Sequence, residues 1–273
     1  MDYKLKYLKY KGKYLSIKNK INNQLGGSST KSIIILDGTS SSGKSTIVKY
    51  FDSKKKYKAI GIEFIDEELS KVIKQKYNDY LKNIPNEYAP VGRREIYNKI
   101  WTSEVLNDGL KAEKGIIDTI FPQMFIDEIK RRGLDEKLYT ILLYTGINDL
   151  ARNLESRRKE GDFRQLFFVF NEFTERYTKS DEDGIDTVNR KKFNEILLDN
   201  FKYEFKNKEE LDKFSINIFE KMGINDDNDH FIKVRDEIEY NYLLNTVGKS
   251  QEEIFKEAEN ILDQLNDSKN EKK

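Results

Sequence analysis

The clearest pattern in the sequence is an unbroken apolar run at residues 33–36, Ile-Ile-Ile-Leu, which a glycine- and serine-rich segment follows. A run without polar positions predicts a central parallel strand that is covered on both faces. After the glycine-rich segment, from Lys44 to about Asp52, the apolar residues Ile47, Val48 and Phe51 recur at helical spacing. The pattern therefore predicts a strand, a polar turn and an amphipathic helix in succession.

The alternation of strand and helix continues along the chain. Further strands are predicted at Tyr57 to Ile62, Gly115 to Asp118, Leu138 to Tyr144 and Tyr240 to Leu244. Helices are predicted at residues 67–83, 93–110 and 149–158, and from about 252 to 265. Strands that alternate with helices indicate an α/β fold built on a doubly wound, mostly parallel sheet of five strands.

Changes in composition divide the chain into parts. Residues 1–29 are predicted to be a basic, Tyr/Lys-rich tail and linker, which ends in the flexible joint Gly-Gly-Ser-Ser. Residues 30–265 are predicted to form one domain with a helical insertion at about 165–235, and residues 266–273 a charged C-terminal tail. The basic tail is interpreted as a lysine-rich helical appendage; the alternative is an amphipathic helix that touches an anionic surface.

Charge and composition exclude several kinds of function. The formal net charge of +1 gives no general attraction to nucleic acid or membranes. The absence of cysteine excludes disulfides, thiolate zinc sites and thiol nucleophiles. The single histidine, His230, lies in a polar stretch and is expected in a solvated loop. No apolar run is long enough to cross a bilayer or to form a signal peptide, so we expect a soluble, intracellular protein.

The glycine-rich segment carries the most specific motif. Residues Gly38, Thr39, Ser40, Ser41, Ser42, Gly43, Lys44 and Ser45 match the P-loop pattern G-x-x-x-x-G-K-[ST] in full, and they stand between a predicted strand and a predicted helix. In such a loop the backbone N–H groups point at phosphate oxygens, and the following helix adds its positive end. We therefore predict that this segment, with Thr46, binds ATP.

Two further groups suit the chemistry of a nucleoside triphosphate. Lys44 is expected to neutralise charge on the β- and γ-phosphates, and the Ser45 hydroxyl to ligate Mg²⁺ together with Asp118 at the end of a neighbouring strand. The alternative for Asp118 is a turn or helix-capping residue. Arg157 and Arg164 flank a charged stretch where a mobile lid would lie, although a solvated helix end has the same composition.

The order of these motifs resembles the chloramphenicol phosphotransferase-like group of P-loop kinases. The resemblance rests on the P-loop, on residues 61–63 (Gly-Ile-Glu), 116–119 (Ile-Ile-Asp-Thr) and 157–164, and on 242–246 (Tyr-Leu-Leu-Asn-Thr). It implies a kinase-type, three-layer P-loop NTPase fold. It also implies that an acid after the second strand acts as the general base. Glu63 stands at that position, where the family has aspartate, and Asp66 is the alternative. The resemblance then places Asn245 and Thr246 beside the adenine, preferred over the competing pair Asp186 and Thr187 because an apolar strand precedes them.

Taken together, the motifs predict a Mg²⁺-dependent phosphotransferase that moves the γ-phosphate of ATP to a hydroxyl of a small molecule. One alternative is a nucleoside or nucleotide kinase. A second is a catalytically inactive nucleotide-binding protein whose insertion is an interaction surface. The N-terminal tail resembles the Tyr/Lys-rich segment, ending in Gly-Gly, of many giant-virus proteins, which implies a host cytoplasm or virion location.

Overall fold

The computed structural model describes residues 32–54, 56–82, 91–112, 114–134, 138–156, 163–235 and 239–267. The predicted N-terminal tail and the last six residues of the predicted C-terminal tail lie outside these ranges. Within them, no helix is long and apolar enough to cross a membrane.

The centre of the structure is a five-stranded parallel sheet, as predicted. Its spatial order is β2-β3-β1-β4-β8. The strands are β1 (Ser32–Asp37), β2 (Lys58–Gly61), β3 (Lys114–Asp118), β4 (Leu138–Tyr144) and β8 (Tyr242–Asn245). All six residues of β1 are buried, because the strand has hydrogen-bonded neighbours on both sides and helices on both faces. The unbroken apolar run is the sequence signature of that position.

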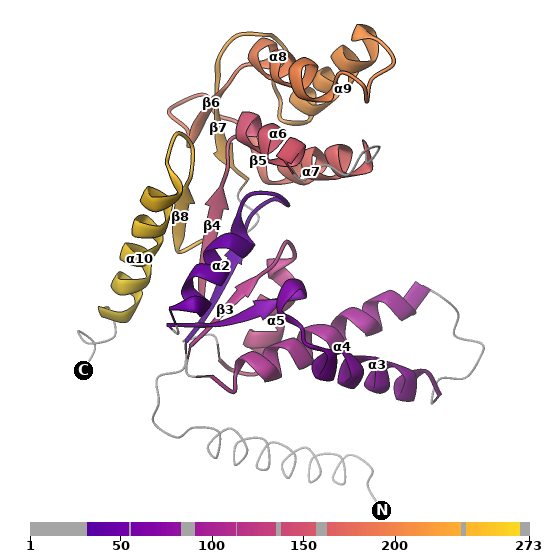
Figure 1. Ribbon diagram of the computed structural model, residues 1–273, viewed down its shortest axis with the longest axis vertical. Helices are drawn as coiled ribbons and strands as arrows, with labels where there is room; N and C mark the ends of the chain where they lie inside the picture. The colour runs from indigo at the N-terminus through magenta and orange to yellow at the C-terminus, as the bar shows by residue number, and fades with distance from the viewer. Residues whose placement is uncertain are drawn as a thin grey trace, which may run out of the picture. The chain divides into compact units, whose positions relative to one another are not determined.

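Helices cover both faces of the sheet, which gives three layers (Figure 1). Alternate residues of a strand point to opposite faces. Ile34 and Leu36 of β1 pack with apolar residues of α2 (Lys44–Ser53) and α10 (Gln251–Asp267). Residues 33 and 35, on the other face, pack with α4 (Val91–Gly109) and α5 (Pro122–Arg131). The predicted three-layer architecture around a five-stranded parallel sheet is thus present, with β1 as the central strand of the sheet.

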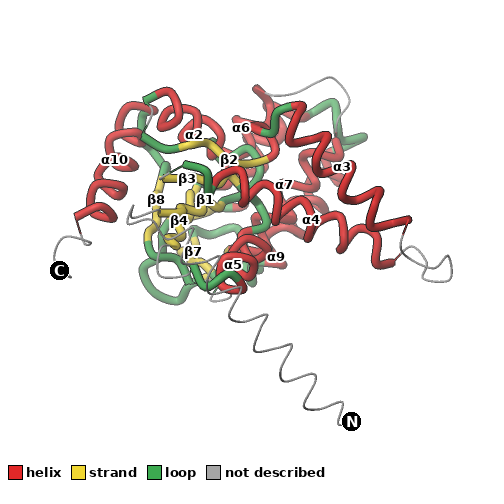
Figure 2. Tube along the Cα trace, turned by 90° about the horizontal axis from the view of Figure 1, so that it is seen from below, coloured by secondary structure: helices red, strands yellow, loops and turns green. Residues whose placement is uncertain are grey.

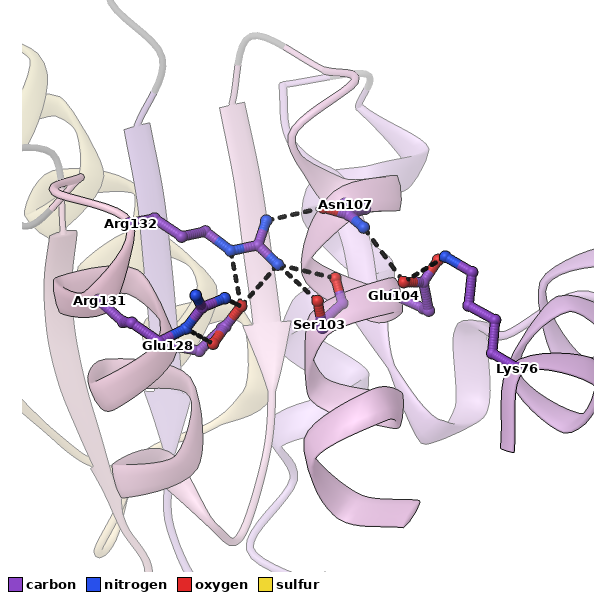
Figure 3. Close-up of polar contacts among 7 residues, drawn as sticks. All are labelled: Lys76, Ser103, Glu104, Asn107, Glu128, Arg131 and Arg132. Atoms are coloured by element: carbon purple, nitrogen blue, oxygen red, sulfur yellow. Dashed lines mark hydrogen bonds and ion pairs between the residues drawn. The ribbon is translucent and has the colours of Figure 1, made fainter. Parts of the chain in front are cut away.

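A polar network ties helix α3 (Glu67–Lys82) and helix α4 to helix α5, and Figure 3 shows it. Arg132, which follows α5, donates to the carboxylate of Glu128 at 2.8 Å, to Asn107 Oδ1 at 2.7 Å and to Ser103 Oγ at 2.9 Å. Lys76 of α3 reaches Glu104 of α4 at 2.8 Å. These contacts fix the pair of helices that follows β2.

The region after β4 is built around helices α6 (Ile147–Ser156) and α7 (Phe163–Arg176). Helix α8 (Arg190–Phe201) and helix α9 (Lys208–Lys221) pack against them. Their shared core is aromatic: the rings of Phe170 and Phe193 meet edge to face with their centroids 5.1 Å apart. Phe170, Phe173, Phe193 and Phe219 are fully buried in this core, whereas Phe167 and Phe168 of α7 are exposed.

A second, antiparallel sheet also lies in this region, where the sequence pattern predicted only helices and loops. Its spatial order is β5-β7-β6, formed by β5 (Tyr177–Lys179), β7 (His230–Val234) and β6 (Asp186–Val188). Two of the strands have three residues each, too few for a period of two to stand out. His230, expected in a solvated loop, opens β7, and its side chain is only 10% exposed beside Asp226. Figure 2 shows β7 among the strands of the molecule.

Candidate nucleotide-binding site

The P-loop leaves the end of β1 and enters α2 through a backbone that only some residues tolerate. Gly38 has φ 155° and Gly43, the N-cap of α2, has φ 98°. A Cβ on Gly38 would lie 2.6 Å from the backbone oxygen of Leu143 in β4, so the loop also approaches its neighbour too closely for a side chain. Ser41 adopts φ 66°, an uncommon left-handed conformation for serine. Such conformations are concentrated at ligand-binding loops.

Lys44 lies under the loop and not in solvent. Its residue is 6% exposed, and its ammonium donates to the backbone oxygens of Gly38 and Thr39, both at 2.8 Å. Burial lowers the pKa of Lys44 below its ordinary value, while the nearby carboxylates of Asp118 and Asp37 act in the opposite direction. A buried cation beside backbone N–H groups is suited to bind an anion.

Ser45 and Asp118 lie against each other, as the predicted metal site requires. The Ser45 hydroxyl donates to the Asp118 carboxylate at 2.5 Å. The pKa of Asp118 is raised above its ordinary value because the carboxyl group is buried. Lys44 and the Ser45 hydroxyl act in the opposite direction but do not cancel the effect of burial. No cluster of three or more acidic or histidine side chains forms a metal site within the described residues. Mg²⁺ does not need one, because it takes one or two protein oxygens and completes its shell with phosphate and water. The residues present therefore fit a magnesium ion.

A cavity of about 560 Å³ adjoins the loop on the side of β8. Ser42, Gly43 and Thr46 line it from the P-loop, and Thr145 and Thr246 from the ends of β4 and β8. The lining also includes Asp149, Arg152 and Asn153 of α6, Gly248 and Lys249 after β8, and Gln251, Ile254 and Phe255 of α10. A mixed apolar and polar cavity next to a phosphate loop has the size and chemistry for a nucleoside.

The two residues expected to border the adenine have different roles in this cavity. Thr246 lines it, and its hydroxyl donates to the backbone oxygen of Tyr144 at 3.0 Å. The side chain of Asn245 points elsewhere: it donates to the backbone oxygen of Ile185 at 2.9 Å and accepts from the N–H of Val247 at 3.0 Å. Asn245 therefore shapes the turn that carries Thr246.

The two candidate bases differ in how their carboxylates are engaged. Glu63 lies in the short 3₁₀ turn after β2, with its side chain 50% exposed and 3.1 Å from the ammonium of Lys49. It is close enough to contribute to the raised pKa of Asp118. Asp66, in contrast, accepts a hydrogen bond from the N–H of Leu69 at 2.7 Å and thus caps α3.

Of the predicted lid arginines, Arg157 lies outside the described residues. Arg164 is the second residue of α7.

Two charged residues that the sequence did not reveal come from α7. Arg176 donates to the carboxylate of Asp37 at 3.0 Å and to the backbone oxygen of Ile120 at 2.8 Å. Tyr240 donates to the other oxygen of Asp37 at 2.5 Å. Glu172, one turn before Arg176, accepts a hydrogen bond from the backbone N–H of Ser40 in the P-loop at 2.7 Å. The only signal in the sequence is an acid and a base four residues apart in a phenylalanine-rich helix, and many surface helices have that spacing.

No protein-family model and no curated protein sequence matches the chain. Among solved structures it is similar to a shikimate kinase from Bacteroides thetaiotaomicron, at 16% identity and a TM-score of 0.40, over 85% of this chain and 98% of that one. A gluconokinase from Sinorhizobium meliloti 1021 is similar at 14% identity and a TM-score of 0.36, over 86% and 98% of the two chains. A deoxyadenosine kinase from M. mycoides with bound dATP has 13% identity and a TM-score of 0.36, over 85% and 99%. Similarities this low do not establish a shared function.

Proposed function

We propose that this chain is a magnesium-dependent phosphotransferase that moves the γ-phosphate of ATP to a hydroxyl group of a small molecule. The observation that carries the proposal is the convergence of Lys44, Ser45 and Asp118 at the ends of β1 and β3, beside a cavity large enough for a nucleoside. A phosphate loop, a carboxylate that can hold a metal and a base pocket are the parts that phosphoryl transfer requires.

Each residue has a role that follows from its position. The N–H groups at the start of α2 and the Lys44 ammonium would hold the phosphates, and Thr246 would face the nucleoside in the cavity. Ser45 and Asp118 would hold the magnesium ion, which when bound neutralises phosphate charge. Lys44 would stabilise the charge that develops on the transferring phosphoryl group.

Glu63 is the better candidate for the general base. Its carboxylate is half exposed after β2, whereas that of Asp66 is committed to capping α3. In the transfer, the acceptor oxygen forms a bond to the γ-phosphorus, and the bond from that phosphorus to the bridging oxygen breaks to release ADP. Glu63 takes the proton that leaves the acceptor hydroxyl.

The test is to incubate the protein with Mg·ATP and a panel of hydroxylated small molecules and nucleosides, and to measure ADP and phosphorylated product. We expect Lys44→Ala to abolish nucleotide binding and transfer. Glu63→Gln is expected to retain binding and lose transfer, while Glu68→Gln, an exposed acid in the first turn of α3, retains both.

The panel also separates the proposal from its alternatives. Transfer to nucleosides or nucleotides alone would favour a nucleoside or nucleotide kinase. ATP binding that depends on Lys44, without transfer to any acceptor, would refute the enzyme and favour a nucleotide-binding interaction protein. Full transfer by Glu63→Gln would refute the assignment of the base.

A further inference from the structure

A carboxylate from helix α7 lies on the phosphate loop. The backbone N–H of Ser40 donates to Glu172 Oε2 at 2.7 Å, across a separation of 132 residues in the chain. Glu172 is 6% exposed. It is also near enough to Lys44 to act on the pKa of that ammonium. Glu172 thus interacts with two groups that otherwise attract phosphate, an N–H of the loop and the buried lysine.

Glu172 contacts the loop at Ser40, four residues before α2 begins at Lys44. The first N–H groups of a helix have no partner within the helix, so those of Lys44 and Ser45 are available to a phosphate. The N–H of Ser42 is already used by the backbone oxygen of Thr39, at 3.2 Å. The loop therefore offers phosphate-binding groups at the start of α2, away from the Ser40 N–H that Glu172 occupies.

The position of Lys44 indicates which phosphate of a bound nucleotide would approach Glu172. In P-loops the lysine reaches the β- and γ-phosphates, while the backbone cradles the α- and β-phosphates. Here the Lys44 ammonium is bonded to the backbone oxygens of Gly38 and Thr39, the two residues before Ser40. The Ser40 end of the loop is thus the side where a third phosphate would lie.

We propose that Glu172 competes with the terminal phosphate of a nucleoside triphosphate for the Ser40 N–H and for the charge of Lys44. The inference rests on the proposed nucleotide site. A diphosphate held at the start of α2 leaves Glu172 in place, whereas a triphosphate must turn its side chain away. Glu172 therefore makes the loop discriminate against triphosphates.

The rest of α7 is anchored while the Glu172 side chain turns. One helical turn later, Arg176 is bonded to the buried carboxylate of Asp37 and to the backbone oxygen of Ile120. These bonds join α7 to the ends of β1 and β3. The competition is therefore a rotation of one side chain, without displacement of the helix.

The test compares Glu172→Gln with wild type in calorimetric titrations with ADP and with a non-hydrolysable ATP analogue, without divalent metal. Glutamine keeps the length of the side chain and an oxygen that accepts from Ser40, but it removes the negative charge. We expect about tenfold tighter binding of the triphosphate, because a unit charge next to the phosphate is removed, and a much smaller gain for ADP. Glu175→Gln, an exposed acid on the same helix, is the matched control and should change neither affinity.

Several results would overturn the inference. They are an unchanged or weaker triphosphate affinity, an equal gain for ADP, or the same gain in Glu175→Gln. If Glu172→Gln does not fold, Glu172→Ala carries the same expectation, since it also removes the charge. Failure of the nucleotide site itself gives a different result: wild type then binds neither nucleotide, or Lys44→Ala binds both as wild type does.

Discussion

Arg132 offers a direct test of how strongly the polar network in Figure 3 holds α4 to α5. Its guanidinium donates to Glu128, Asn107 and both oxygens of Ser103, and its side chain is only 17% exposed. Arg132→Met keeps an unbranched chain of similar length but removes every one of these bonds. In the variant, the two Ser103 oxygens and the Asn107 side-chain oxygen lose the hydrogen bonds that they accept from Arg132.

The expected loss follows from the number and burial of these contacts. Two nitrogens of Arg132, Nε and Nη2, each lie 2.8 Å from the carboxylate of Glu128, whose side chain is 14% exposed, and the other contacts reach neutral oxygens. A net loss of about 2–3 kcal/mol in the free energy of unfolding is expected. Arg131→Met is the matched control. Arg131 bonds the same carboxylate, but its side chain is 64% exposed, so its removal should cost about 0.5 kcal/mol.

Urea denaturation of the two variants and wild type measures the difference, provided that the dependence on denaturant is the same for all three. The pH dependence is a second readout. Burial alone would raise the pKa of Glu128, but the hydrogen bonds from Arg131 and Arg132 hold it below its ordinary value. A carboxyl with a lowered folded-state pKa contributes stability above its unfolded pKa and loses it as the pH falls through the folded one. The difference in the free energy of unfolding between wild type and Arg132→Met should therefore become smaller as the pH falls and Glu128 is protonated. Equal losses in the two variants at neutral pH would refute the reasoning.

Three further predictions concern the loop and its surroundings. Arg176→Met removes the guanidinium that is bonded to the fully buried Asp37 and should cost about 3 kcal/mol in the same denaturation assay, and a loss below 1 kcal/mol would contradict it. Gly38→Ala places a Cβ 2.6 Å from the backbone oxygen of Leu143, so the loop must change its conformation. We expect a folded protein whose ATP affinity, measured by calorimetry, is strongly reduced; an unchanged affinity would contradict this expectation. Burial raises the folded-state pKa of Asp118, so a proton competes with Mg²⁺ for its carboxylate at a higher pH than for an ordinary aspartate. The cost of burying the ionised carboxylate also lowers the stability of the fold, and this cost disappears as the pH falls through the folded-state pKa. The affinity for Mg·ATP should thus weaken more steeply on acidification in wild type than in Asp118→Asn, which retains only the dependence that protonation of the ATP phosphate causes; equal dependences in the two proteins would refute the assignment.

The sequence predicted the parts of the fold whose signal is local. The run at residues 33–36 identified the central strand, and the P-loop pattern required a strand before it and a helix after it. Parallel strands that are buried on both faces are apolar throughout, and this is why β1 and most of β4 could be recognised; the edge strand β8 is also apolar in sequence, although Leu244 is its one buried residue. Boundaries were less accurate: the strand predicted at Tyr57 to Ile62 is shorter, Lys58–Gly61, because Ile62 opens a 3₁₀ turn.

The parts that the sequence did not predict depend on contacts between distant residues. Glu172 and Arg176 have ordinary helical spacing, and only the packing of α7 brings them to Ser40 and Asp37. The small antiparallel sheet depends on β7 returning between β5 and β6 after two helices. A single sequence carries no local signal for such a return. The predicted Asn245 is likewise next to the cavity but directed at a neighbouring turn.

The order of the strands also bears on how the chain folds. β1 carries the phosphate loop, yet its two hydrogen-bonded neighbours come much later in the chain: Ile33 is opposite Gly115 on one side and Leu138 on the other. Contacts between such distant segments require closure of long loops before they contribute energy, so this sheet should assemble slowly. Gly38, one of the positive-φ residues of the loop, lies against Leu143 of β4, so the surroundings of the loop are complete only after β4 has docked. Recovery of nucleotide binding after dilution from denaturant would therefore follow the slowest step of refolding, and a fragment that ends before β4 would lack a working loop.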